Sequence, residues 1–473
     1  MRASNVTTGY LVLLLHAHLP YVHHPEDDQF LEEKWLFEAI SETYLPLLRM
    51  MDSLERDKVP FKLAVSMSPT LTTMLKDALL QQRYVNHLQM MLELADREIR
   101  RTRDDAVFGQ LAQMYQTLYE NNLRDFTEKY EHDITRGFDY FYKRGKLEII
   151  ATAATHAYLP LYMQHPPAIR AQVQVGVADN ARVFGKGPRG LWLPECGYAP
   201  GLEQYLTDQG IEYFFVATHG LVFADERPTS GVYEPIVCDN GIAAFGRDHV
   251  TTNAVWSAED GYPSDISYRD FYRDIGHDLP LDYIGSFLPE GSVRINTGFK
   301  YYAVTGKTDH KLPYVPEAAR RKATEHAENF VYKLTERVTR LCDLMETPPV
   351  VSCPFDAELF GHWWFEGPMW LESLIRGIAE SDVIELTTPS EYLKAVPNHG
   401  QGQPALSSWG NKGYSEVWLD GSNDWIYRHT HKAIERMCEL IERFPDETGL
   451  KRRALNQAAG EVLLSQASDW PFI

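Results

Sequence analysis

Two acidic residues, Glu195 and Asp356, each come directly after an apolar run with the composition of a buried strand. In parallel α/β barrels, catalytic groups collect where the strands end, so the two carboxylates could act together. A strand-end carboxylate can also be a solvated surface group. The rings of Trp192 and Tyr198 beside Glu195 favour an apolar, ring-lined site over that alternative.

Two histidines follow the first apolar run of the chain, in the segment HAHLPY at residues 16–21. Residues i and i+2 of a strand point to the same side, so His16 and His18 would face one cavity. They fit hydrogen-bonded core histidines, and they equally fit two ligands of a metal ion that also takes a nearby carboxylate. The sequence leaves both interpretations open.

Aromatic side chains are concentrated after Asp356 and again in a later glycine-rich segment. The stretch from Asp356 to Glu366 holds three acids, one histidine and two tryptophans, a composition that a structural core rarely carries. Trp409 and Trp418 stand in the later segment, where an exposed indole costs solubility unless it stacks on a ligand. Those two rings could instead cap the barrel core.

Two strand-end carboxylates among Trp, Tyr and His side chains are the residue types that cleave glycosidic bonds. One carboxylate attacks the anomeric carbon, and the other donates a proton to the leaving oxygen and later takes one from the acceptor. Flat aromatic rings offer contact surfaces for the apolar faces of sugars. Glu195 and Asp356 are therefore our candidate catalytic pair.

Apolar runs of strand length alternate with helical or loop segments, which is typical of an α/β fold with a parallel sheet. Continuous apolar runs indicate strands that are covered on both faces. Six or seven such strands fit a closed barrel better than a doubly wound sheet, and no GxGxxG follows the first run to indicate dinucleotide binding. The runs are residues 11–15, 61–65, 147–151, 190–194, 213–217, 242–245 and 350–355.

Helical patterns interrupt and follow the strand pattern. Residues 72–145 are rich in Leu, Gln, Glu, Arg and Met at helical spacing, so we predict a helical insertion there. We expect the barrel to occupy residues 1–71 and 146–395, and a C-terminal loop and helical domain to occupy residues 396–473. In that last helical part, the residues that fall near one face are Trp425, Tyr427, His431, Ile434 and Cys438.

The 473 residues include 46 Lys and Arg against 66 Asp and Glu, a net charge of −20. A charge this negative disfavours nucleic acid and anionic membranes as partners. The five cysteines are scattered without a CxxC pair, which indicates a reducing compartment and no disulfide framework. No signal-peptide pattern precedes the first strand, so we expect a cytoplasmic protein, with a monomer favoured.

Together these segments resemble glycoside hydrolase family 57. The matching pieces are HAHLPY at 16–21, GKLE at 145–148, ATHAYLP at 154–160, WLPECGY at 192–198 and PFDAELFGHWWFEG at 354–367. Within the family the chain is similar to the 1,4-α-glucan branching enzymes, on WSAEDGYP at 256–263, SSWG at 407–410 and SDWPF at 468–472. Those enzymes usually continue past the last segment, so we expect a shortened C-terminal end.

The resemblance implies a (β/α)7 barrel with a helical insertion and a C-terminal helical domain. It implies a retaining double displacement without metal or cofactor, with Glu195 as nucleophile and Asp356 as acid/base. The substrate would be an α-1,4-glucan such as amylose or a glycogen-like polymer, and transfer would form an α-1,6 branch, as in glycogen biosynthesis. The glucan subsites would be lined by His16, His18, His156, Trp363, Trp409 and Trp418, with Arg247 as a further strand-end candidate.

Hydrolysis and branching share the glycosyl-enzyme and differ in the acceptor, which is water in the first case and a sugar 6-hydroxyl in the second. Excluding water from a closed site favours transfer, and a long loop at residues 249–266 could do this. In branching enzymes of the family a loop tyrosine shields the intermediate, and Tyr262 is the best local match.

Three other functions fit part of the pattern. An α-glucan hydrolase of the α-amylase type, or a 4-α-glucanotransferase, would use the same two carboxylates. A metal-dependent hydrolase or deacetylase would use His16 and His18 as ligands. A non-catalytic glucan-binding relative gains little support, because both carboxylates are present.

Overall fold

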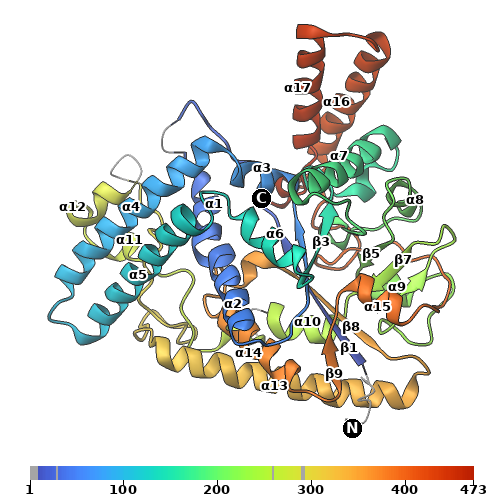
Figure 1. Cartoon of the computed structure of the whole chain (residues 1–473). Helices are drawn as coiled ribbons and strands as arrows, with labels where there is room; N and C mark the ends of the chain where they lie inside the picture. The colour runs from blue at the N-terminus through green and yellow to red at the C-terminus, as the bar shows by residue number, and fades with distance from the viewer. Residues whose placement is uncertain (1–8, 28–29, 258–259, 289–292) are drawn as a thin grey trace.

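The computed structural model describes residues 9–27, 30–257, 260–288 and 293–473 (Figure 1). Within these ranges a curled sheet is surrounded by helices, which confirms the predicted α/β fold class. Each of the apolar runs coincides with a strand. The strands are β1 (Gly9–Ala17), β2 (Leu63–Met67), β3 (Leu147–Thr152), β4 (Gly190–Trp192), β5 (Tyr213–Val216), β6 (Ile236–Val237), β7 (Ala243–Gly246), β8 (Val350–Asp356) and β9 (Ile384–Leu386).

The sheet is mostly parallel and nearly closes on itself. Its hydrogen-bonded order is β6-β7-β5-β4-β3-β2-β1-β8, with β9 also pairing β1. All pairs are parallel except β6 with β7. One hydrogen bond connects the two edge regions of this sheet. The backbone N–H of Asp248, just after β7, donates to the carbonyl of Ser352 in β8 at 2.9 Å. The carboxyl ends of the parallel strands therefore surround one space.

Strand alternation explains why a histidine at the end of β1 points into that space. Val12 and Leu14 belong to the buried cluster inside the curled sheet, whereas the alternate leucines of β1 pack outward under the helices. Because successive side chains of a strand point to opposite faces, His16 continues the inner series. It ends the series as a polar group where β1 reaches the carboxyl edge.

The same alternation places two more polar residues inward. Val350 of β8 and Phe245 of β7 lie in the inner cluster. Counting in steps of two from these residues leads to Asp356 at the end of β8 and to Arg247 just after β7. The pattern of the buried strands thus delivers His16, Asp356 and Arg247 to one edge of the sheet.

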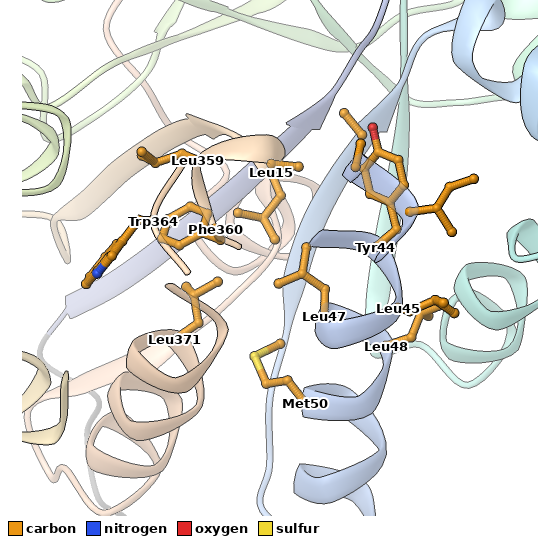
Figure 2. Packing of buried hydrophobic residues seen from close by; sticks show 14 of the residues in the cluster. Leu15, Tyr44, Leu45, Leu47, Leu48, Met50, Leu359, Phe360, Trp364 and Leu371 are labelled. Carbon is orange, nitrogen blue, oxygen red and sulfur yellow. The ribbon is translucent and has the colours of Figure 1, made fainter. Parts of the chain in front are cut away.

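Helices pack on the outer face of β1 and hold it in place. Figure 2 shows Leu15 of β1 between Tyr44 and Leu47 on one side and Phe360 on the other. Tyr44 ends a π-helical turn, η1 (Ile40–Tyr44), that joins α1 (Glu33–Ala39) to α2 (Leu45–Arg56). On the other side, α14 (Gly367–Ala379) contributes Leu371 (Figure 2).

The segment between β2 and β3 is helical. It forms α3 (Pro69–Leu75), α4 (Ala78–Arg101), α5 (Ala106–Arg124) and α6 (Thr135–Lys143). Aspartates begin the two long helices: Asp77 accepts from Leu80 N, and Asp105 accepts from Val107 N and Phe108 N, which satisfies amides that have no intrahelical partner. The division of the chain into domains stays a prediction.

The remaining helices of the sheet region connect its strands or cover them. They are α7 (Pro166–Phe184), α8 (Glu203–Thr207), α9 (Thr218–Val222), α10 (His249–Trp256), α11 (Ile275–Asp278), α12 (Leu281–Ile284), α13 (Pro316–Leu344) and α15 (Pro389–Ala395). Helix α10 corrects the expected loop at residues 249–266. Its first turn is capped by the side chain of Asp248, which accepts from Thr251 N. Residues 258–259 of that expected loop lie outside the described residues.

The C-terminal part is a helical hairpin followed by a return to the sheet. Helices α16 (Asp424–Arg443) and α17 (Gly449–Leu464) stand away from the sheet beside α7, and the chain then returns to the body as α18 (Asp469–Phe472) (Figure 1). Tyr427 and Ile434 are buried, but Trp425 is 54% exposed, so placing Trp425 on their face was wrong. Residues two positions apart on an α-helix are separated by about 200° around its axis. The Trp425 side chain therefore points away from the face that Tyr427 occupies.

Two further observations concern the chain as a whole. None of the described helices combines the length and apolar composition needed to cross a membrane. In the described ranges, which include all five cysteines, no disulfide joins any two of them.

Candidate active site

Glu195 is held in a strained turn after β4. Its backbone has φ 62° and ψ 20°, and Cys196 follows with φ 51°. Non-glycine residues pay about 1–2 kcal/mol to adopt this left-handed conformation, and such strain collects at functional sites. Hydrogen bonds from Cys196 N to Leu193 O and from Gly197 N to Pro194 O, both 2.9 Å, fix the turn. The turn therefore gives the Glu195 carboxylate a direction that it would not have if β4 continued as a straight strand.

Two side chains from the C-terminal quarter of the chain bind the Glu195 carboxylate. Trp409 Nε1 donates to Oε2 at 2.7 Å, and Ser468 Oγ donates to Oε1 at 3.0 Å. Trp409 N also donates to the backbone carbonyl of Glu195 at 2.9 Å. Burial raises the pKa of Glu195 to about 7, although the two side-chain donors oppose this by stabilising the ionised form.

Asp356 stands at the end of β8, in register with His16 of the neighbouring strand. Burial raises the pKa of Asp356 well above its ordinary value, and the charges of Glu358 and Glu195 raise it further. Arg247 acts in the opposite direction. The guanidinium of Arg247 lies 5.3 Å from the ring centroid of Trp409 and donates from Nε to Thr252 Oγ1 at 2.9 Å. The site therefore holds two carboxyl groups with raised pKa values and one cation.

Glu358, two residues after Asp356, is a third buried acid. It accepts a 2.5 Å hydrogen bond from the Tyr44 hydroxyl and a 3.2 Å hydrogen bond from His18 N. Burial raises the pKa of Glu358 to about 7. Its contacts connect the backbone of His18 to Tyr44 at the end of η1, so Glu358 positions a neighbour of the candidate pair.

Two histidines, His16 and His156, form a hydrogen-bonded pair beside Glu195. His16 Nε2 and His156 Nε2 are 2.8 Å apart, and the outer nitrogen of each ring contacts a serine: His16 Nδ1 lies 3.2 Å from Ser66 Oγ and His156 Nδ1 lies 2.8 Å from Ser468 Oγ. Burial lowers the pKa of both His16 and His156 well below the ordinary value, so both rings are neutral.

The contacts of this group determine where its protons are. Ser468 donates to ionised Glu195, so its oxygen accepts from His156 Nδ1–H. A neutral imidazole has one donor and one acceptor nitrogen, so His156 Nε2 accepts from His16 Nε2–H. His16 Nδ1 in turn accepts from the Ser66 hydroxyl. One directed series of hydrogen bonds thus runs from β2 to the candidate nucleophile.

His18 stacks on this series and binds the C-terminal segment. Its ring lies 3.8 Å from the His156 ring, centroid to centroid, at an interplanar angle of 13°. His18 Nδ1 contacts Ser68 Oγ at 2.8 Å, and Nε2 contacts Asp469 Oδ2 at 3.1 Å. Ser468 and Asp469 therefore attach the start of α18 to the site through two different histidines.

A metal ion bound by His16 and His18, one of our alternatives, does not match this geometry. In the described part of the chain, the donor atoms that gather within 4.8 Å belong to His18, His156 and Asp469, and His16 is engaged with His156 instead. The two gathered rings are stacked face to face, so their lone pairs lie in parallel planes. A tetrahedral ion needs lone pairs that converge.

Tryptophans form one wall of the site. Trp192 is buried under His16 and Trp409, with ring centroids 5.3 and 4.9 Å away. Trp256 lies 5.9 Å from Trp409 and 6.3 Å from Trp363, again between centroids. Trp363 is 45% exposed, so its ring is available to a ligand. Trp409 and Trp363 are thus connected through Trp256.

Two predicted subsite residues are not on that wall. Trp418 is 2% exposed and stacks on Tyr158 at 4.6 Å, because a large indole in this segment is stabilised by burial. As placed, it supports Tyr158 and presents no free face. The Tyr262 hydroxyl donates to Asn329 Oδ1 of α13 at 2.8 Å, so the ring packs on that helix. These placements correct our expectation for Trp418 and Tyr262 in this conformation.

Sequence reasoning missed Ser468 and Asp469, which contact Glu195 and His18, and it did not single out Trp256 or Glu358 as site residues. The SDWPF segment at 468–472 had been noticed only as part of the resemblance. This segment has two polar residues, Ser468 and Asp469, next to Trp470 at the end of a helical region. That composition alone does not predict which residues the segment contacts.

Two families match the chain. Residues 12–403 match the family described as glycosyl hydrolase family 57, and residues 429–473 match the family described as 1,4-alpha-glucan branching enzyme, C-terminal. A curated relative, a 1,4-alpha-glucan branching enzyme of Thermococcus kodakarensis, is 32% identical over 500 residues, covering 98% of this chain and 70% of the relative.

Two solved structures are similar over nearly the whole chain. The alpha-amylase AmyC of Thermotoga maritima is 44% identical with a TM-score of 0.93, covering 99% of this chain and 88% of that one. The branching enzyme of Pyrococcus horikoshii is 31% identical with a TM-score of 0.87, covering 98% of this chain and 85% of that one.

Proposed function

The chain belongs to glycosyl hydrolase family 57, and from this we propose that it is a 1,4-α-glucan branching enzyme. It cleaves an α-1,4-glucan and transfers the released segment to a 6-hydroxyl, which forms an α-1,6 branch. One observation favours branching over the other activities of the family. The segment that matches the branching-enzyme C-terminal family supplies Ser468 and Asp469, and both contact the site.

In the first step Glu195 attacks the anomeric carbon and Asp356 protonates the leaving oxygen. The environments of the two carboxyl groups support these roles. Two donors stabilise the ionised form of Glu195, the form that attacks. Burial and two neighbouring carboxylates raise the pKa of Asp356 well above its ordinary value, which keeps it protonated as an acid must be.

Once Asp356 has given up its proton, Arg247 stabilises the resulting carboxylate. The glycosyl-enzyme on Glu195 then waits for an acceptor. A sugar 6-hydroxyl attacks the anomeric carbon, Asp356 takes its proton, and Glu195 leaves as a carboxylate that Trp409 and Ser468 again stabilise. Each of these groups is in place before the reaction, so little reorganisation is needed.

The rings around the carboxylates suit a glucan chain. Trp363 and Trp409 provide flat apolar surfaces, and Trp256 connects them. We assign His16, His18 and His156 to the wall next to Glu195, and Arg247 to the side formed by Asp356 and Trp409. A location in the cytoplasm and a monomeric state stay predictions.

The test is a linkage analysis of amylose after incubation with the protein. New α-1,6 linkages that outnumber new reducing ends support branching. Glu195→Gln should lose both products, and full activity of that variant would rule out the catalytic assignment. The second candidate is α-glucan hydrolysis, favoured by the 44% identity to the Thermotoga maritima amylase; reducing ends without branch points would establish it instead.

A further inference from the structure

A surface hollow of about 530 Å³ opens between the glycine-rich segment, the start of α16 and α18. Its lining includes Asn411, Asp420, Trp425, Trp470 and Phe472, and we call it the tail hollow. Sites for small ligands typically measure about 300–1,000 Å³. The tail hollow is therefore large enough to hold sugar residues.

Two indoles line the tail hollow without being buried. Trp425 is 54% exposed and Trp470 is 39% exposed. Both are partly fixed: Trp470 Nε1 donates to Leu464 O at 2.8 Å, and the Trp425 ring contacts His429 edge-on, with centroids 6.3 Å apart. Neighbouring exposed aromatic side chains mark a binding surface more often than scattered ones do.

The polar lining has the chemistry of a carbohydrate site. Glu416, Asp420 and Asn411 bring carboxylate and amide groups to a hollow that has one lysine, Lys412. Asn423 Nδ2 donates to Pro471 O and to Val417 O, both at 3.1 Å, so the glycine-rich segment and α18 are connected across the floor. Two acids against one cation disfavour an anionic ligand, whereas hydroxyl groups can donate to carboxylates and amides.

The segments that form the tail hollow also hold the candidate nucleophile. Asn411 comes two residues after Trp409, and Trp470 comes two residues after Ser468. Because consecutive Cα atoms are about 3.8 Å apart, the Cα atoms of Asn411 and Trp470 lie within about 7.6 Å of those of Trp409 and Ser468, which bind Glu195. The same two segments therefore build the tail hollow and the Glu195 site.

We propose that the tail hollow binds a segment of an α-1,4-glucan chain whose neighbouring part reaches Glu195. The apolar faces of the glucose units stack on Trp425 and Trp470, and their hydroxyl groups donate to Asp420 and Glu416. The choice of ligand rests on the proposed function. The bound segment belongs either to the chain that is cleaved or to the chain that receives it, and these two sources share one chemistry.

The first experiment measures binding without turnover. Amylose binding to Glu195→Gln is compared with binding to the double variant Glu195→Gln/Trp425→Ala. We expect the dissociation constant to rise roughly 3- to 10-fold, the loss that corresponds to one aromatic contact. The control replaces Tyr332 by alanine in the same background, because Tyr332 is 64% exposed on α13, outside the tail hollow, and amylose binding should not change.

The second experiment uses the active protein to identify the source of the chain. If Trp425→Ala raises the KM for amylose and leaves the ratio of α-1,6 linkages to reducing ends unchanged, the tail hollow binds the cleaved chain. A lower ratio means that it binds the receiving chain. Equal affinity and equal kinetics in Trp425→Ala and Tyr332→Ala would overturn the proposal. Failure of the wild-type protein to make α-1,6 linkages would refute the branching function and leave the binding comparison intact.

Discussion

Replacing Ser468 by alanine tests whether the C-terminal segment controls the nucleophile. The hydroxyl donates to Glu195 Oε1 at 3.0 Å and lies 2.8 Å from His156 Nδ1. A hydrogen bond to a charged group contributes about 1.5–3 kcal/mol, and one pKa unit corresponds to 1.36 kcal/mol. Because the bond stabilises the ionised form, its loss should raise the pKa of Glu195 from about 7 by about one to two units.

In the proposed mechanism Glu195 must be ionised to attack, so we expect activity to rise with pH through the pKa of Glu195. In Ser468→Ala the acid limb of the pH profile of kcat/KM should move to higher pH by about one to two units, because the lost hydrogen bond shifts the pKa of Glu195 by that amount. At pH 7 the smaller ionised fraction lowers kcat/KM by about 5- to 50-fold, and the deficit shrinks as the pH rises. The assay measures the initial rate of amylose conversion from about pH 5 to about pH 9, which spans the range in which Glu195 titrates.

The matched control is Ser465→Ala. That hydroxyl donates to Val462 O at 2.8 Å in the same C-terminal segment and belongs to the end of α17, so the pH profile should stay that of the wild type. A lower rate at every pH, with an unmoved acid limb, would indicate a structural effect of the substitution and refute the reasoning. Thermal unfolding of both variants checks that the fold is retained.

Three further substitutions test the carboxylate environments and the core, and a fourth, on the surface, is the control for the last of them. Trp409→Phe removes the 2.7 Å donor to Glu195 and should lower kcat/KM at pH 7 by about 10-fold or more, with the acid limb again at higher pH; an unchanged profile contradicts the assignment. The pKa of Glu195 is raised from 4.5 to about 7, so its ionisation costs about 3 kcal/mol of stability as the pH rises through that window. Glu195→Gln should therefore unfold at a higher temperature than the wild type at pH 8, with the difference vanishing near pH 4.5. Arg269→Ala leaves the buried carboxylate of Glu42 without its 2.8 and 3.0 Å partners and should cost about 3–5 kcal/mol in denaturant unfolding. Arg340→Ala, which breaks an exposed ion pair, should cost less than about 1 kcal/mol.

The sequence was sufficient for seven of the nine strands in the described residues and for the residues at their ends, whereas the short strands β6 and β9 were not predicted. Buried parallel strands are apolar on both faces, so each run was visible, and the first polar residue after it was a candidate for the site. Asp356 and His16 were found this way, and they are in register in the structure. Glu195 was found by the same rule, although the turn that directs it has left-handed backbone angles.

The corrections at Trp418 and Tyr262 concern residues whose placement depends on distant partners. Trp418 is buried because Tyr158, far away in the sequence, offers its ring, and neither spacing nor composition indicates that pairing. Helix α10 did have a local signal, since Asp248 is a residue type that begins helices. Ser468 and Asp469 had none, because a hydrogen bond across hundreds of residues leaves no periodic pattern.

The contact between His18 and Asp469 also sets an order of events in the cell. The two residues are 451 positions apart, and synthesis at 5–20 residues per second separates their appearance by about 20–90 s. During that interval β1 can pair with β2, and β2 with β3, but Ser468, which donates to Glu195, has not been made. The sheet can therefore begin to form before the candidate site is complete, and the full set of contacts to Glu195 forms only when α18 docks.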